Sequence, residues 1–244
     1  MVKLLSSDTT IEAQRFLVGQ LRRMPLDKKY AVTLASIQAG MSLHSSEPGT
    51  MNPFDVTHQV TQFLESEGIE YFVGGSLAST TYGEPRFTQD VDIIVRLTEE
   101  KVGRLADRFQ SDYYLSRPAL MEAIRRRGSA NLIHLETNFK VDLILSRERP
   151  FEHSRFKRKV RKHSDGKAFW FCTAEDIVLV KLEWYKKSGE VLERQLRDVQ
   201  TVLMVQDPVD LDYLHRWADE LGLSELLAVS LRDAGIVDDR DPSR

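Results

Sequence analysis

The stretch from Tyr71 to Val95 constrains the fold of this chain more than any other. It reads YFVGGSLASTTYGEPRFTQDVDIIV: a short apolar run, a glycine pair, a helix-length segment and an acid-bearing run. Two adjacent glycines after a β-rich run let the backbone turn sharply and approach another group closely. The pattern therefore predicts a strand, a tight turn, a short helix and a second strand.

Gly74, Gly75 and Ser76 form this turn and begin the expected helix. Exposed amides at a helix start, with the positive end of the helix dipole behind them, form an anion site, to which the Ser76 hydroxyl adds a donor. An ordinary strand-to-helix turn is the commoner explanation of a lone Gly-Gly-Ser sequence. The anion-site interpretation of the turn therefore depends on the acids that follow it.

Asp90 and Asp92 lie two residues apart at the start of the second apolar run. Side chains alternate along a strand, so both carboxylates point to one face while Val91, Ile93 and Val95 point to the other. Two neighbouring carboxylates repel each other unless a hard cation such as Mg²⁺ binds between them. The alternative is that Asp90 closes a turn and Asp92 lies on a solvated edge.

Asp142 is a third acid, placed in the strand-like run Phe139 to Leu145. The apolar phase of this run leaves Asp142 on the opposite face, together with Lys140 and Ile144. A charge inside such an apolar strand is costly unless it is paired or bound to metal. Three such carboxylates could hold two metal ions about 4 Å apart, which favours the metal-site interpretation.

The ordered set of Gly75-Ser76, Asp90-x-Asp92 and Asp142 resembles the polymerase-β type of nucleotidyltransferase. The segment from Gly83 to Arg86 and the helical C-terminal part are similar to bacterial stand-alone nucleotidyltransferases, including the abortive-infection toxin group. The core resemblance covers residues 54–145, continues more weakly to 221, and does not reach the first fifty residues.

The resemblance implies an α/β (α+β) fold, with a mixed sheet flanked by helices. It also implies transfer of a nucleoside monophosphate from an NTP such as ATP, with release of pyrophosphate. It assigns the β- and γ-phosphates to the turn, both metals to Asp90 and Asp92, and the catalytic metal and the acceptor hydroxyl to Asp142. The implied cofactor is a pair of Mg²⁺ ions, with Mn²⁺ as an alternative.

Further candidate ligands lie outside these motifs. Arg86 precedes the acid pair by four residues and is a candidate triphosphate or acceptor ligand. Lys181 falls on or beside the apolar face of a helix that begins with a capping-box pattern at Thr173. Such a position is unusual for a lysine unless an acidic partner or a phosphate lies within its reach. In the similar enzymes a lysine on this helix contacts the triphosphate. The other interpretation is a helix–helix salt bridge between Lys181 and Asp198.

Two basic clusters, at residues 125–127 and 155–163, have two interpretations. They form either a track for RNA or triphosphate, or a solvated charged surface. His134 either lines the pocket or is a hydrogen-bonded strand histidine, and the second interpretation is the commoner one.

Composition narrows the class of protein. The chain has 244 residues, 41% hydrophobic and 29% charged, and its net charge of −3 does not favour nucleic-acid binding through overall charge. The single cysteine, Cys172, excludes a disulfide framework and a cysteine-rich zinc site. There is no signal-peptide pattern and no run of membrane-spanning length, so we expect a cytoplasmic protein with no membrane partner.

Three regions are expected: an N-terminal helical arm (1–50), a catalytic core (54–172) and a C-terminal helical region (173–236). The arm should contain one helix with an apolar stripe of Ile11, Phe16, Leu17 and Leu21, and a second helix around Ala31 to Ile37. Residues 45–53 form the clearest linker. The arm is expected to pack on the core or on a second subunit, as in a homo-oligomer.

The leading hypothesis is a nucleotidyltransferase that modifies RNA, most simply the 3′ end of tRNA, as a toxin with a cognate antitoxin partner. Rival acceptors are a protein hydroxyl, to which AMP or UMP would be added, and a small molecule such as an antibiotic. From a different class, the rival is a catalytically silent scaffold that serves as an antitoxin or binds a partner. Fold alone does not choose among these activities.

Overall fold

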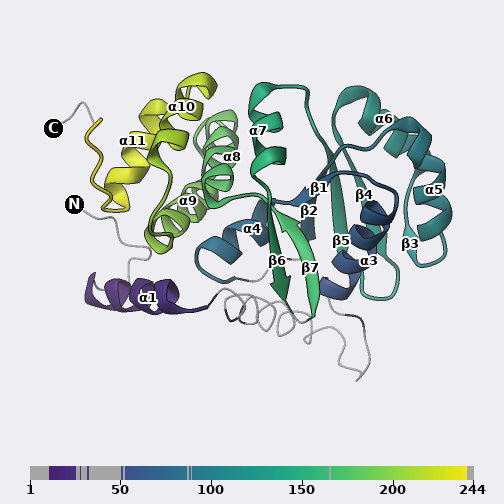
Figure 1. Ribbon diagram of the computed structural model, residues 1–244, viewed down its shortest axis with the longest axis horizontal. Coiled ribbons are helices and arrows are strands. Elements are labelled where there is room, and N and C mark those ends of the chain that lie inside the picture. Colours follow the sequence, from purple (N-terminus) through teal and green to yellow (C-terminus); the bar gives the residue numbers. More distant parts are fainter. Residues whose placement is uncertain are drawn as a thin grey trace. The chain divides into compact units, whose positions relative to one another are not determined.

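The computed structural model describes residues 11–25, 28, 32, 51, 53–86, 88, 90–164 and 166–240. The chain divides into two compact units (Figure 1). The sheet unit comprises Tyr30–Leu77 and Arg86–Cys172, and the helical unit comprises Met1–Lys29, Ala78–Pro85 and Thr173–Arg244. The second predicted helix of the arm, around Ala31 to Ile37, and most of the predicted linker lie outside the described residues.

The sheet unit is built on a seven-stranded mixed sheet with the order β3-β4-β5-β2-β1-β7-β6. Its strands are β1 (Tyr71–Val73), β2 (Asp90–Val95), β3 (Tyr113–Tyr114), β4 (Ser129–His134), β5 (Lys140–Leu145), β6 (Val160–Ser164) and β7 (Lys167–Phe171). The pairs β2 with β5 and β1 with β7 are parallel, and the other pairs are antiparallel. The predicted α/β class with a mixed sheet is confirmed.

Side-chain alternation along β2 and β5 follows the sequence prediction. Val91, Ile93 and Val95 on β2 are fully buried, as are their partners on β5. Burying each such side chain stabilises the fold by about 1.5–3 kcal/mol. Asp90, Asp92, Lys140 and Asp142 alternate with these positions and therefore share the opposite face of the sheet.

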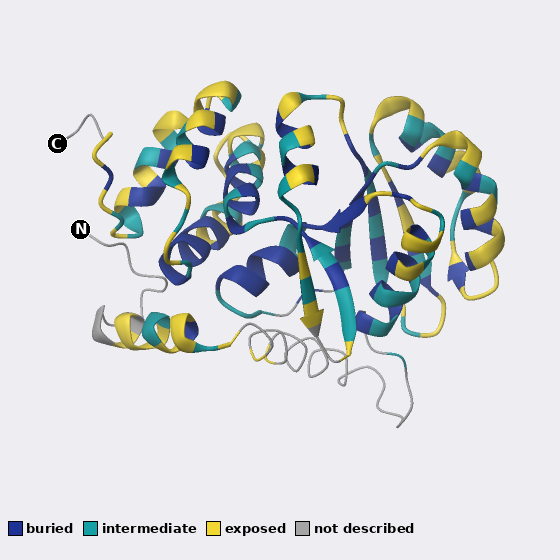
Figure 2. Cartoon of the chain, viewed as in Figure 1, coloured by how far each residue is buried: buried dark blue, intermediate teal, exposed yellow. Residues whose placement is uncertain are grey.

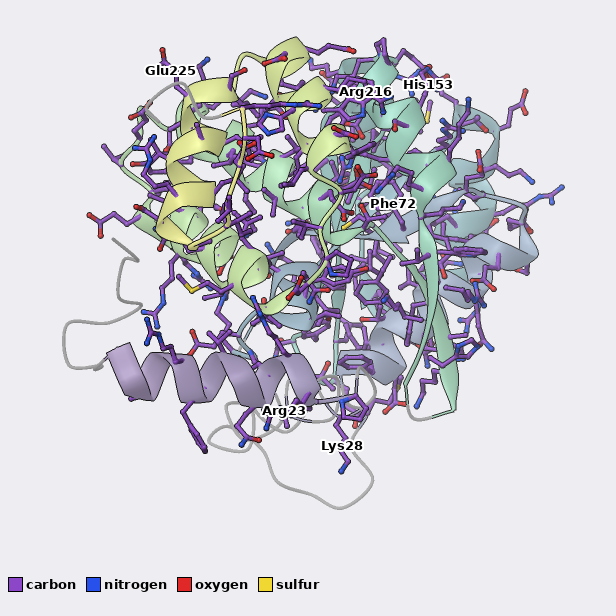
Figure 3. The ribbon with its side chains drawn as sticks, turned by 60° about the vertical axis from the view of Figure 1, so that its left-hand side comes forward. Arg23, Lys28, Phe72, His153, Arg216 and Glu225 are labelled. Carbon is purple, nitrogen blue, oxygen red and sulfur yellow. The ribbon has the colours of Figure 1, made fainter. Side chains whose placement is uncertain are left out.

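Helices cover both faces of the sheet near β1. The sheet unit contains α3 (Pro53–Ser66), α5 (Glu99–Phe109), α6 (Arg117–Arg126) and α7 (Pro150–Arg158). On the apolar face, the Tyr71 hydroxyl donates to Glu65 of α3 at 2.7 Å, and Phe63 of α3 packs on Phe109 of α5. On the other face, the buried Phe72 ring, labelled in Figure 3, packs on Phe156 of α7 with ring centroids 4.8 Å apart.

The helical unit contains α1 (Ile11–Arg23), α8 (Ala174–Lys187), α9 (Glu193–Val205), α10 (Leu211–Leu221) and α11 (Ser224–Asp233). The predicted capping box at Thr173 is present, with its hydroxyl accepting from the amide of Asp176. Asp176 is fully buried and also accepts a 2.6 Å hydrogen bond from the Tyr213 hydroxyl of α10. Arg22 of α1 donates to the carbonyl of Met204 of α9 at 2.9 Å.

Helix α4 (Gly75–Tyr82) is divided between the two units after Leu77. Most of this helix is buried, as Figure 2 shows. Its C-terminal end is fixed within the helical unit, because Gln206 donates to the carbonyl of Tyr82 at 2.5 Å. A Cβ on Gly83 would lie 2.7 Å from the Thr201 hydroxyl oxygen of α9, so the chain after α4 passes very close to α9.

One region of the fold was not expected from the sequence. Residues 150–171 form α7 and the β6–β7 hairpin, whereas the sequence suggested only a basic cluster at 155–163. On α1, Leu21 of the predicted apolar stripe is buried, whereas the side chain of Phe16 is 70% exposed in the single chain. No helix in the described part of the chain combines the length and apolarity that a membrane span requires.

Candidate active site

The glycine turn between β1 and α4 lies against the acid-bearing strand. The amide of Gly74 donates to the carbonyl of Asp92 at 2.9 Å, and Gly75 has a φ of +55°. A Cβ on Gly75 would lie 1.6 Å from Asp92 Oδ2, and one on Gly74 would lie 2.6 Å from Ile94 Cδ1. Only glycine fits the position of Gly75, and the turn thereby comes into direct proximity with the Asp92 carboxylate.

Ser76 and Arg86 meet beside this turn. Arg86 Nη2 donates to Ser76 Oγ at 3.1 Å. Ser76 lies in the first turn of α4, where amides and the helix dipole favour an anion. A guanidinium adds a full positive charge and two parallel donors suited to phosphate oxygens. The structure therefore joins two of the residues that the sequence predicts as nucleotide ligands.

The three predicted carboxylates lie on one face of adjacent parallel strands. Asp92 of β2 pairs directly with Asp142 of β5, and Asp90 pairs with Lys140 one step along the same face. The Asp142 side chain is 17% exposed and that of Asp90 is 37% exposed. The Thr88 hydroxyl donates to Asp90 Oδ1 at 3.1 Å and orients that carboxylate. The face is acidic and partly exposed.

Lys140 lies between two of these acids. Its Nζ is 2.8 Å from Asp142 Oδ2 and 3.6 Å from Asp90 Oδ2. The hydrogen bond to Asp142 raises the pKa of the Lys140 ammonium above its ordinary value, so Lys140 is charged at neutral pH. We call the face formed by Asp90, Asp92, Lys140 and Asp142 the acidic face. The Lys140 ammonium is thus a cation of the chain itself that lies among these carboxylates.

One observation fits a hard divalent cation at the acidic face. Asp142 Oδ1 is buried and accepts no hydrogen bond from the described residues. Carboxylate oxygens are the ligands that Mg²⁺ prefers. Within the described ranges, no group of three or more His, Cys, Asp or Glu side chains is already arranged around a metal position. The assignment of metals to Asp90, Asp92 and Asp142 therefore stays a prediction.

A solved structure shares this architecture. The chain is similar to an antigenic nucleotidyltransferase-like protein from Paracoccidioides brasiliensis, with a TM-score of 0.55 over 78% of this chain and 95% of that chain. The chain has a nucleotidyltransferase-like fold. The sequence identity is 19%, so the likeness concerns the fold and assigns no residue roles.

Two other structures with nucleotidyltransferase names resemble the chain more weakly. The lincosamide antibiotic adenylyltransferase LnuA, bound to lincomycin, has a TM-score of 0.43 and 9% identity over 65% of this chain and all of that chain. A CCA-adding enzyme in complex with ATP has a TM-score of 0.34 and 10% identity over 76% of this chain and 54% of that chain. No protein-family model matches the chain, and no curated protein matches it in sequence.

Lys181 belongs to the helical unit of this nucleotidyltransferase-like fold. Its Nζ lies 2.8 Å from Asp198 Oδ2, and both side chains are less than 10% exposed. Ser79 Oγ donates to the same Asp198 oxygen at 3.2 Å. The helix–helix salt bridge that the sequence allowed is therefore present. The role of Lys181 as a triphosphate ligand stays a prediction.

His134 and part of the second basic cluster take structural positions. His134 is buried, lies 2.9 Å from the Thr137 hydroxyl through Nδ1 and packs edge-on against Tyr113. In the second cluster, Arg155 is buried and pairs with Glu152 at 2.8 Å. Lys159 and Arg161 pair with Glu70 and Glu65 respectively. Part of the run 155–163 is therefore paired within the sheet unit, and its binding of RNA or triphosphate stays a prediction.

Two polar neighbours of the acids carried no role in the sequence analysis. Lys140 was placed on the Asp142 face but given no function, and Asn131 was not singled out. Asn131 of β4 is exposed and pairs directly with Asp142, which extends the polar row beyond β5. The alternation of polar and apolar residues in Ser129 to His134 was the available signal for Asn131. The Lys140 contacts depend on strand register, which the sequence does not display.

Proposed function

We propose that the protein is a Mg²⁺-dependent nucleotidyltransferase, which transfers a nucleoside monophosphate from an NTP to an acceptor hydroxyl. The observation that carries this proposal is the direct pairing of Asp92 with Asp142, with the Gly75 turn in contact range of Asp92. A helix start suited to bind an anion would then lie next to two carboxylates suited to bind a metal. A nucleoside triphosphate bound to a divalent cation needs both features.

The chemistry requires positioning and charge neutralisation more than covalent catalysis. Mg²⁺ held by Asp90, Asp92 and Asp142 would supply positive charge opposite the triphosphate oxygens. The amides of Gly75 and Ser76 and the guanidinium of Arg86 bind and orient the β- and γ-phosphates. Asp142 accepts the proton of the acceptor hydroxyl, whose oxygen bonds to the α-phosphorus as the bond to pyrophosphate breaks.

The first experiment is incubation of the purified protein with each α-³²P-labelled NTP, Mg²⁺, total RNA and cell lysate. We expect Mg²⁺-dependent labelling of an acceptor by the unmodified protein and loss of at least about 100-fold in Asp92→Asn, because a metal ligand is lost. The matched control is Asp107→Asn, an exposed acid of the sheet unit that pairs with Arg117. Undiminished labelling by Asp92→Asn would overturn the assigned mechanism.

For the acceptor we propose RNA, with the 3′ end of tRNA as the first candidate. Support comes from the exposed cations Arg125, Arg126 and Arg127, whose carboxylate partners Glu122 and Glu148 are in exposed or half-exposed pairs. Such pairs are weak, so phosphate oxygens can replace them. A labelled RNA band supports this acceptor, whereas a labelled protein band would replace it with protein modification.

Use of the protein as a toxin is the finer form of the proposal. Induced expression should then arrest growth, and the Asp92→Asn variant should not. A neighbouring antitoxin would restore growth by binding the protein. If Mg²⁺-dependent NTP binding occurs without transfer to RNA, protein or small molecules, a catalytically silent scaffold replaces the enzyme.

A further inference from the structure

The Lys140 ammonium lies between two carboxylates of the acidic face. Its nitrogen lies 2.8 Å from one oxygen of Asp142 and 3.6 Å from one oxygen of Asp90. The lysine and the two acids belong to neighbouring strands in fixed register, with Lys140 directly opposite Asp90. The contact is therefore set by the sheet and not by a mobile loop.

We infer that the Lys140 ammonium is a resident counter-cation, which holds the carboxylates together in the metal-free protein and must leave when a divalent cation binds. This inference rests on the proposed function and adds a positioning residue to it. The ammonium lies beside Asp142 Oδ2 and opposes a divalent cation at the other carboxylate oxygens, because like charges so close together repel each other strongly.

The exposure of the three side chains permits such an exchange. Lys140 and Asp90 are 35% and 37% exposed, so the lysine can swing to solvent on its flexible stem. Asp142 is 17% exposed and keeps its second oxygen, Oδ1, without a hydrogen bond. The lysine thus neutralises only part of the site and leaves a ligand oxygen for the arriving cation.

A consequence concerns how the cation enters. Because Lys140 opposes binding of the bare ion, the ion binds best when it arrives with a triphosphate, whose oxygens attract the displaced ammonium. Lys140 therefore couples metal binding to nucleotide binding. Removal of the ammonium should strengthen binding of the bare ion and weaken this coupling.

The test measures Mn²⁺ binding directly, by the loss of the electron paramagnetic resonance signal of free Mn²⁺, with no nucleotide and no turnover. We expect Lys140→Met to bind Mn²⁺ at least about tenfold more tightly than the unmodified protein, because a nearby positive charge is removed. Lys140→Arg, which keeps the charge, should stay within about threefold of the unmodified protein. Circular dichroism verifies folding, and Lys140→Gln replaces Lys140→Met if that variant does not fold.

The matched control is Lys101→Met. Lys101 is a partly exposed lysine of α5 in the same unit, away from the acidic face, and it pairs at 3.0 Å with Glu67, which follows α3 directly. Its variant should bind Mn²⁺ as the unmodified protein does. In the double variant Lys140→Met/Asp142→Asn the gain should disappear, which would locate the effect at Asp142.

The outcomes separate this inference from the proposed function. Equal or weaker Mn²⁺ binding by Lys140→Met, or an equal gain in Lys101→Met, would overturn the inference even if nucleotidyl transfer is found. A tenfold gain specific to Lys140→Met would support the inference even if no acceptor is labelled, and the proposed transfer would then be wrong. An absence of Mn²⁺ binding in every variant would overturn the inference, while the labelling assay would still decide the proposed function.

Discussion

Each unit of the molecule contains a lysine–aspartate pair with the same nitrogen–oxygen distance, 2.8 Å. In the sheet unit, Lys140 and Asp142 are 35% and 17% exposed. In the helical unit, Lys181 and Asp198 are 7% and 8% exposed, and Asp198 accepts a further hydrogen bond from Ser79. Equal contact distances therefore occur in very different surroundings.

The surroundings decide what each pair can do. The pair in the sheet unit faces a second carboxylate, and Asp142 has an oxygen without a partner, so it can exchange one cation for another. The pair in the helical unit is closed off from water and connects α8, α9 and the second half of α4. A buried charge without its partner is far more costly than an exposed one. We therefore expect the Lys140–Asp142 pair to belong to a ligand site in the sheet unit. We expect the Lys181–Asp198 pair to stabilise the packing of helices in the helical unit.

The largest expected effect comes from breaking the buried pair. Asp198→Ala leaves the Lys181 ammonium buried without its carboxylate, and should lower the free energy of unfolding by about 3–5 kcal/mol. Urea denaturation followed by circular dichroism measures the change. The double variant Lys181→Met/Asp198→Leu should recover most of the loss, because it removes both charges. A loss below 1 kcal/mol in Asp198→Ala, as is usual for exposed pairs, would contradict the contrast between the two units.

The next effect tests how closely the glycine turn approaches the acidic face. Gly75→Ala should lower the free energy of unfolding by about 2–4 kcal/mol, through a strained φ and a clash with Asp92. Gly68→Ala is the control, because Gly68 also has a positive φ but has no atom within 4 Å of an added Cβ. That control should lose only about 1 kcal/mol. Equal losses would mean that the turn relaxes away from Asp92.

The third prediction concerns Asp142, whose substitution should affect activity strongly and stability only weakly. Asp142→Asn should change the free energy of unfolding by less than about 1 kcal/mol, because it also relieves repulsion with Asp90 and Asp92. In the labelling assay the same variant should lose at least about 100-fold of its activity, because the proton acceptor and a metal ligand are lost. Strong destabilisation would instead identify Asp142 as a structural residue.

Local patterns in the sequence predicted the elements that carry the acidic face. Alternation in Asp90 to Val95 and in Lys140 to Leu145 gave the correct faces, because the period of a strand fixes which side chains share a side. The capping box at Thr173 likewise marked the start of α8. These signals are local, so a single sequence displays them.

Contacts between distant residues set the limit of sequence analysis. The basic run 155–163 was not recognised as part of α7 and β6. Its residues Lys159 and Arg161 pair with acids 89 and 96 residues earlier in the chain, and a local sequence pattern does not show such contacts. Strand register placed Lys140 opposite Asp90, and no local pattern encodes that register. The division of α4 between two units was not predicted either, since close packing at Gly83 depends on α9.

The smallest expected effect concerns Glu65, whose pair with Arg161 is about as exposed as the pair of Lys140 with Asp142. Burial opposes ionisation of Glu65, but hydrogen bonds from Arg161 and Tyr71 outweigh it and lower the pKa of the Glu65 carboxyl. A lowered pKa stabilises the fold at pH values above the ordinary value near 4.5, and the stabilisation disappears as the pH falls through the folded-state pKa. Because both side chains are about one-third exposed, we expect less than about 1 kcal/mol.

Glu65→Gln tests this expectation, with the exposed Glu136→Gln as the control. The difference in unfolding free energy between the unmodified protein and Glu65→Gln should be constant from pH 6 to 8 and should shrink below pH 4.5, while the control shows almost no difference at any pH. Urea denaturation at each pH provides the measurement. A difference that grows as the pH falls would mean that burial, and not the pair with Arg161, dominates at Glu65. The Arg161–Glu65 pair would then resemble the buried Lys181–Asp198 pair of the helical unit more than the Lys140–Asp142 pair of the acidic face.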